Sequence, residues 1–350
     1  MKIHSQTLTG WVLLTVFGML TAACSSGSLS SAVLSEDALE VQNHLDSGAN
    51  VNERDENGQT PLHLAAKEGY KEVAGMLINN SANVDAKDKQ GRTPMHLAAR
   101  EGHARLVDFL SDRGASLDSH DNRGQTPLHF AVLSGEYEAA YTLTLKNAPV
   151  NAKNDKGWTP LYLASLNNLP EFVELLIDKG AEVNPPSGPT PLMAAVWNNH
   201  GKVVQMLLEK NAPVQGTPNA VKTPMHMAAE QGHVEVAEIL LDFQADPYIK
   251  DKTGKPPIYY ATINGHEDMV ELLVGYGEDV NQHIEGTTLL HLAAEKGHAD
   301  VVEILIEKGA VLNAHNSSGD TPLEVAINNR QETVANLITE AAIEKKKIRN

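Results

Sequence analysis

The 350-residue sequence predicts an all-α solenoid of about ten helix-turn-helix repeats joined by β-turn fingers. The first observation is a Thr-Pro pair, or a close variant, that recurs with a period near 33 residues. It opens at Thr60, Thr93, Thr126, Thr159, Thr190, Thr223, Pro256, Thr288 and Thr321. The second observation is that aromatic residues make up only 5% of the chain, which suits many small contacts between short helices. The fixed period indicates stacked units rather than two or three separate globular domains.

Residues 1–23 are predicted to be a signal peptide. An apolar run from Trp11 to Leu20 is followed by small residues, which is the layout of a secretory signal. The run is shorter than the roughly 20 residues that a membrane-spanning helix needs. The motif "LTAAC" that follows resembles the lipobox of bacterial lipoproteins, in which the chain is cut before the cysteine and the cysteine is lipidated. The resemblance implies a lipid on Cys24, with an ordinary secretory signal and a cytosolic chain as the alternatives.

Residues 24–31 are expected to form a tether between this lipid and the folded array. The stretch "SSGSLSS" is rich in Ser and Gly, a composition typical of flexible linkers. Ser25 stands where inner-membrane lipoproteins of Gram-negative bacteria often have Asp. The resemblance therefore implies the bacterial cell envelope, and it favours the periplasmic side of the outer membrane.

The repeat array is predicted to span residues 32–343. Residues 32–57 look like a degenerate first repeat, with Ser35 as a helix N-cap and Gly48 as a helix stop. At the other end, residues 344–350 are predicted to form a charged tail. One helix pair cannot bury its own apolar faces, so a stacked array needs polar caps at both ends. The two terminal segments are suited to that role.

The stretch "TPLHLAAKEG", residues 60–69, shows why one unit starts and stops a helix. Pro61 takes a favoured first-turn position, and Leu62 with the alanine pair supplies an apolar face. Gly69 then ends the helix, because glycine adopts left-handed backbone without strain. The stop recurs as Gly102, Gly135, Gly232, Gly265 and Gly297, with Asn168 and Asn199 in two units. A second apolar helix and a polar finger such as "NAKNDKG" complete each unit.

The T-P-L-H-x-A motif with this period resembles the ankyrin repeat, and the resemblance covers about residues 32–343. It implies that His63 hydrogen-bonds locally and steadies the turn before the helix. The equivalent positions hold His96, His129, Tyr162, Met193, His226, Tyr259, His291 and Glu324. The histidines of the Gly-His pairs, at His103, His233, His266 and His298, are expected to be structural as well. A zinc ion needs nitrogens about 2.0 to 2.1 Å away, whereas stacked helices lie about 8 to 10 Å apart, so we expect no metal site.

Motifs for catalysis and for nucleotide binding are absent from the sequence. It contains no HExxH, GxSxG or GxxxxGK[ST] pattern, and Cys24 is its only cysteine. The net charge of −17 would repel a phosphate backbone. We therefore expect a protein that is not an enzyme, needs no cofactor and binds no nucleic acid.

The resemblance also implies a protein partner on the concave face, which the finger residues and the ends of the first helices form. Large apolar residues occupy such positions near the middle of the array, and the predicted partner-binding residues are Leu133, Trp158, Leu166, Trp197 and Ile263. Clustered exposed apolar residues tend to mark interaction sites, and Trp is enriched among binding hot spots. The alternative is that these side chains pack on one another, because the shortened finger "NPPSGP" could let Trp158 fold inward.

The sequence thus favours a non-enzymatic interaction module that a lipid anchor displays from a bacterial membrane. The alternative is an inhibitor, protector or immunity protein for an envelope enzyme. An enzyme that co-purifies with the chain and changes its activity on binding would favour the second function.

Overall fold

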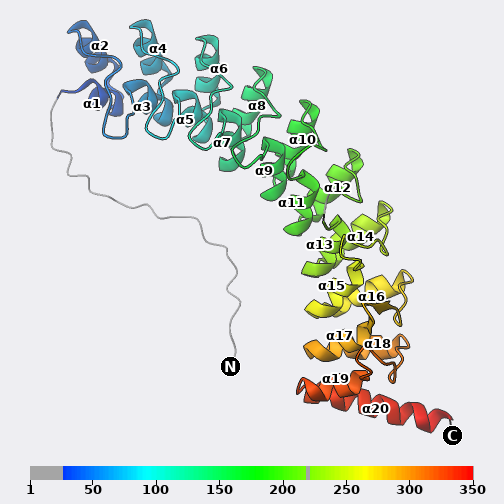
Figure 1. Cartoon of the computed structure of the whole chain (residues 1–350). Helices are drawn as coiled ribbons and strands as arrows, with labels where there is room; N and C mark the ends of the chain where they lie inside the picture. The colour runs from blue at the N-terminus through cyan, green and yellow to red at the C-terminus, as the bar shows by residue number, and fades with distance from the viewer. Residues whose placement is uncertain (1–26, 218–220, 350) are drawn as a thin grey trace.

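The computed structural model of this chain describes residues 27–217 and 221–349. The predicted signal peptide at 1–23 and the predicted lipid site at Cys24 lie outside the described residues. Within the described ranges, twenty helices follow one another as ten pairs along a curved array (Figure 1). The predicted all-α solenoid of about ten repeats is confirmed.

The first helix of each pair lies along the inner side of the arc (Figure 1). These inner helices are α1 (Leu29–Leu34), α3 (Pro61–Glu68), α5 (Pro94–Arg100), α7 (Pro127–Ser134), α9 (Pro160–Leu166), α11 (Pro191–Trp197), α13 (Pro224–Gln231), α15 (Pro257–Asn264), α17 (Leu289–Lys296) and α19 (Pro322–Asn328). The second helices are α2 (Ala38–Asp46), α4 (Lys71–Asn79), α6 (Ala104–Asp112), α8 (Tyr137–Leu145), α10 (Pro170–Asp178), α12 (Gly201–Glu209), α14 (Val234–Asp242), α16 (Glu267–Gly275), α18 (Ala299–Glu307) and α20 (Glu332–Arg349). Those from α2 to α18 form the outer side of the arc.

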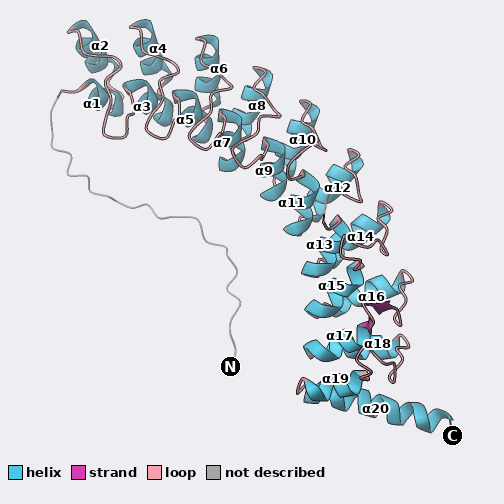
Figure 2. Ribbon diagram, viewed as in Figure 1, coloured by secondary structure: helices cyan, strands magenta, loops and turns pink. Residues whose placement is uncertain are grey.

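Two short strands, β1 (His283–Ile284) and β2 (Thr287–Thr288), pair antiparallel in the finger before α17 (Figure 2). Their register places His283 opposite Thr288. The two residues between the strands, Glu285 and Gly286, both have positive φ, at 52° and 79°. A two-residue turn with both φ angles positive matches the right-handed twist of a β-hairpin, which explains why this finger forms a ladder.

The inner helices start and stop as their sequence predicts. Thr60 is the N-cap of α3 and Pro61 is its first residue, and Gly69 ends the helix with φ at 83°. Where asparagine replaces the glycine, at Asn168 and Asn199, φ is also positive, at 53° and 58°. The residues at the two ends of these helices therefore fix the length of each helix.

The first repeat begins earlier than predicted, and its cap was assigned wrongly. Ser28 is the N-cap of α1, and its hydroxyl accepts a hydrogen bond from the Ser31 N–H. The helix that Gly48 follows is α2, and its N-cap is Asp37 rather than the predicted Ser35. Ser35 is the C-cap of α1, where its N–H donates back to the Ser31 carbonyl and the next N–H, of Glu36, donates to the Val33 carbonyl. Leu29 is buried, so its apolar side chain favours starting the helix within the Ser-rich stretch. Residues 29–31 thus belong to the array rather than to a tether.

The last helix also extends beyond the predicted array. The segment predicted as a charged tail continues α20 to Arg349. Val334 and Ile338 are buried and anchor the first turns of this helix to the array. The following residues are mostly Ala, Glu and Lys, which favour helix, and no Gly or Pro interrupts them.

One continuous apolar core of leucine, valine and alanine runs through the array. Each helix pair packs against the pairs before and after it, as α5 does against α3 and α7. This nearest-neighbour packing is the arrangement by which a repeat array buries faces that no single unit covers. Within the described residues, no helix has the length and apolarity needed to cross a membrane.

Candidate protein-interaction surface

The histidine after each Thr-Pro pair braces the turn, as expected. The Nδ1 atom of His63 lies 3.1 Å from the Thr60 N and 2.8 Å from the Thr60 Oγ1. Its Nε2 atom lies 2.9 Å from the carbonyl oxygen of Arg92 in the next repeat. Since a carbonyl oxygen only accepts, Nε2 carries the proton and Nδ1 accepts from Thr60. One neutral ring thus joins the helix start to the neighbouring finger.

This Thr-His brace recurs wherever the repeat keeps its histidine. The Nε2 atoms of His96, His129, His226 and His291 reach the carbonyl oxygens of Gln125, Trp158, Lys255 and Asp320. Burial lowers the pKa of each of the five rings below its usual value, and it lowers the pKa of His96 to about 4. Desolvation opposes protonation because the charged form loses water. The rings are therefore neutral scaffold groups near pH 7.

The Gly-His histidines tie adjacent inner helices together. The Nε2 atom of His103 lies 2.9 Å from the Lys67 carbonyl oxygen of the preceding repeat. His233 makes the same bond to the Trp197 carbonyl oxygen at 3.1 Å, which holds the backbone of a predicted binding residue. Both histidine sets thus have structural hydrogen bonds. Across the described residues, no cluster of His, Cys, Asp and Glu is placed to hold a metal ion.

The predicted binding residues lie at the ends of inner helices or just before them, but they differ in exposure. Trp197 on α11 and Leu133 on α7 expose 49% and 46% of their surface. Trp158, Leu166 and Ile263 are half-buried and pack against the core. Neighbouring helices bring together the positions on α7, α9 and α11. Ile263 is apart from them on α15, because α13 lies between and carries Glu230 at the equivalent position.

Trp158 is neither free nor fully turned inward. Its ring stacks on Tyr162, with centroids 5.2 Å apart and planes 28° from parallel. The Lys156 ammonium lies 4.4 Å from the Trp158 ring centroid. An aromatic pair and a cation–π contact both restrict the indole. These contacts therefore hold the Trp158 ring in place within its own repeat.

An apolar pocket of about 430 Å³ lies next to Trp197. Pro189, Met193, Trp197, Val221 and Met227 are among its lining residues. Its size falls within the range of about 300 to 1,000 Å³ that is usual for ligand pockets. Methionine side chains adapt to differently shaped apolar groups, so the lining suits the side chains of a protein partner.

The sequence pattern does not identify the two methionines and Val221 as pocket residues. Met193 stands where other repeats have the brace histidine, and Val221 stands where the other fingers have glycine. Repeat register alone does not show that these residues face one pocket. The available signal was the pair of methionines at near-equivalent positions of consecutive repeats.

Two charged residues, Lys222 and Glu230, also line this pocket. Lys222 makes a 2.7 Å salt bridge to Glu230, and its ammonium lies 3.9 Å from the Tyr260 ring centroid. The Tyr260 hydroxyl donates to Asp251. Burial and this hydrogen bond raise the pKa of Tyr260 to about 12. Burial would raise the pKa of Asp251, but the hydrogen bonds that its carboxylate accepts outweigh burial and lower that pKa to about 2. The salt bridge and the cation–π contact thus hold Lys222 in place beside the apolar pocket.

Comparison with known families agrees with this geometry. The family model described as ankyrin repeats, in three copies, matches residues 29–121, 86–154, 128–220, 214–284 and 276–348. A comparison with curated proteins found no significant match. Ankyrin repeat proteins are generally non-enzymatic modules that bind other proteins. Because the matches together span nearly all of the array, the chain belongs to the ankyrin repeat family.

Proposed function

We propose that this chain is a non-enzymatic protein-binding module that a lipid on Cys24 displays from a bacterial membrane, on the periplasmic side of the outer membrane. The partner binds the concave face, with Trp197 at the centre of the contact. The interaction uses no cofactor and does not involve nucleic acid.

The observation that carries the proposal is the exposure of Trp197 beside an apolar pocket in the middle of the inner helices. A half-exposed indole costs solvation free energy in the unbound chain, and covering it with a partner recovers that energy. The pocket beside it accepts an apolar side chain of the partner. Leu133 extends the same apolar strip towards the first repeats. Hot spots tend to combine such an aromatic anchor with an adjacent pocket.

The anchor proposal rests on sequence. The motif "LTAAC" precedes a Ser/Gly-rich stretch, and the folded array begins shortly afterwards at α1. This order is what a surface-displayed array requires, because the binding face has to be held outside the bilayer.

The test compares Trp197→Ala with the intact chain in affinity capture from bacterial envelope extracts and in thermal melts. We expect binding to weaken by about 2 kcal/mol or more, the scale of a hot spot, with little change in the melt. A loss of about 3 to 5 kcal/mol of folding stability would instead indicate a packed core residue. A normal melt with undiminished capture would contradict the proposed site. Val311→Ala, at another exposed apolar residue, is the matched control.

The same capture separates the two roles that the sequence left open. A captured enzyme whose activity changes on binding would identify the chain as an inhibitor, protector or immunity protein. A captured protein without such a change would support a scaffold.

A further inference from the structure

The outer helices carry polar or acidic residues at two outward positions, and α8 is the exception. In five of the outer helices from α2 to α18, the fifth residue is acidic: Asp108, Glu174, Glu238, Glu271 and Glu303. In the other outer helices, apart from α8, the fifth residue is Gln or Gly. The ninth residue is Asp46, Asp112, Asp178, Glu209, Asp242 or Glu307, with Asn or Gly elsewhere. In α8 these positions hold Tyr141 and Leu145. The repeat architecture itself therefore does not require apolar residues here.

These residues form an exposed strip that we call the α8 stripe: Tyr137, Tyr141 and Leu145. They expose 38%, 39% and 53% of their surface. Their spacing of four residues places them on one face of the helix. Tyr137 and Tyr141 stack with centroids 6.3 Å apart, and Tyr137 rests edge-on against the buried ring of Phe172. The stripe is thus ordered before any partner arrives, which lowers the entropic cost of binding.

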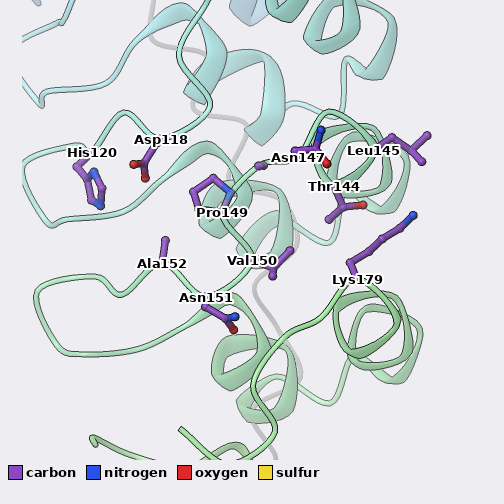
Figure 3. Close-up of a pocket in the computed structure, with 11 residues that line it drawn as sticks. Asp118, His120, Thr144, Leu145, Asn147, Pro149, Val150, Asn151, Ala152 and Lys179 are labelled. Atoms are coloured by element: carbon purple, nitrogen blue, oxygen red, sulfur yellow. The ribbon is translucent and has the colours of Figure 1, made fainter. Parts of the chain in front are cut away.

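The stripe leads into a groove of about 750 Å³. Figure 3 shows the groove between the loop that follows α8, with Pro149 and Val150, and the finger residues Asp118 and His120. Leu145 belongs to both the stripe and the groove. Lys179 also lines the groove, and its ammonium lies 5.6 Å from the Tyr141 ring centroid. Stripe and groove therefore form one continuous surface through Leu145 and Lys179.

Carboxylates surround this surface and indicate the charge of its occupant. Lys146 bridges Asp108 at 2.9 Å and Asp112 at 2.6 Å, so its charge is already compensated. Glu138 on α8 and Glu174 on α10 are exposed, and neither has a salt bridge within the described part of the chain. Lys179 is the lysine of the groove lining. The whole chain carries a net charge of −17.

We propose that the α8 stripe is a second docking surface, which takes a basic amphipathic helix of a partner protein. Apolar residues of that helix cover the stripe, and its Lys or Arg side chains reach Glu138 and Glu174. A second copy of this chain is disfavoured, because it would bring like-charged faces together and because three side chains are few for the roughly 800 Å² that each partner buries in a standard interface. An anionic membrane is disfavoured by the same charges.

The test uses the double variant Tyr141→Glu with Leu145→Asp, which gives α8 the residues that α10 and α14 carry at these positions. The probe is a fluorescent synthetic helix of leucine and lysine with the leucines on one face. A second, control probe has glutamate in place of every lysine. We expect the purified chain to bind only the lysine probe, and the variant to bind it at least about tenfold more weakly.

This design separates docking from general attraction to an acidic protein. The variant is more acidic than the parent, so a purely electrostatic contact would tighten, and unchanged or tighter binding would overturn the proposal. The control Gln42→Glu with Asn79→Asp adds the same charge at the equivalent positions of α2 and α4 and should retain binding. Two results would overturn the proposed occupant. The first is that the parent chain forms a dimer and the double variant does not. The second is that the parent chain binds phosphatidylglycerol vesicles and the double variant does not. Circular dichroism melts establish that the variants fold, and Trp197→Ala should leave probe binding unchanged.

Discussion

At the scale of single residues, one histidine satisfies several polar groups that the array would otherwise bury without a partner. His96 is fully buried, and its Nδ1 accepts from the Thr93 N–H at 3.0 Å. Its Nε2–H donates to the Gln125 carbonyl oxygen of the next repeat at 3.0 Å. Burying such backbone groups without hydrogen bonds is costly, which explains why a polar ring occupies a core position.

The first prediction follows from these bonds. His96→Gln should lower the free energy of unfolding by about 1 to 3 kcal/mol, because glutamine cannot serve both backbone partners with the rigid ring's geometry. Urea unfolding followed by circular dichroism measures the change. His283→Gln, at an exposed finger position, should leave stability nearly unchanged. An equal loss in the two variants would count against the brace.

The second prediction concerns how the folding stability depends on pH. The folded pKa values of the five brace histidines lie below the ordinary value of 6.5, so the folded state stays neutral while unfolded imidazoles protonate. Their contribution to stability is therefore present above about pH 6.5 and is lost as the pH falls, for His96 down to about 4. Each group contributes up to about 1.4 kcal/mol per pH unit in this window.

Urea unfolding at several pH values between neutral and mildly acidic conditions checks this slope. His96→Gln removes one of the titrating groups and should make the slope shallower. Stability that stays constant through this window would show that the rings protonate freely in the folded chain.

At the scale of elements, what sequence predicts well is what local chemistry decides. Thr60, Pro61 and Gly69 set the ends of α3 within the unit itself, so the repeat register gave the inner helices correctly. The start of α1 depends on burial of Leu29 in the core, a tertiary effect that a Ser-rich stretch conceals. The repeat register predicts that Trp197 and Leu133 are exposed, as the structure has them. The pocket at Met193, in contrast, depends on how the shortened finger before α11 folds.

The third prediction separates two roles of the helix-stop glycine. Gly69 and Gly135 occupy the same repeat position with φ at 83° and 75°. A Cβ on Gly69 would lie 2.7 Å from the His103 ring, while a Cβ on Gly135 would meet nothing within 4 Å. Gly135→Ala should cost about 1 to 2 kcal/mol for left-handed backbone alone. Gly69→Ala should cost more, because the His103 ring has to move and its bond to Lys67 weakens. Chemical unfolding of the two variants compares them directly, and equal losses would refute the close-contact role.

At the scale of the whole molecule, the array and its proposed anchor are separable. Among the described residues, each repeat packs mainly on its neighbours, so a change before α1 should leave the stacked core intact. Five residue steps separate Cys24 from Leu29, and an extended chain of that length reaches at most about 18 Å. A lipid on Cys24 would therefore hold the first repeat close to the bilayer, with the arc extending away from α1.

The fourth prediction is that Cys24→Ala moves the protein from the membrane fraction to the soluble fraction, or stalls it with its first 23 residues uncleaved. The melt of the array should not change, because Cys24 precedes the first core residue, Leu29. Ser26→Ala, two residues further along, is the matched control and should remain lipidated and membrane-bound. Mass spectrometry of the mature N-terminal peptide should find a lipid on Cys24 in the parent and in the control. An unmodified Cys24, together with membrane fractionation that the substitution leaves unchanged, would show that something other than this cysteine holds the array at the membrane.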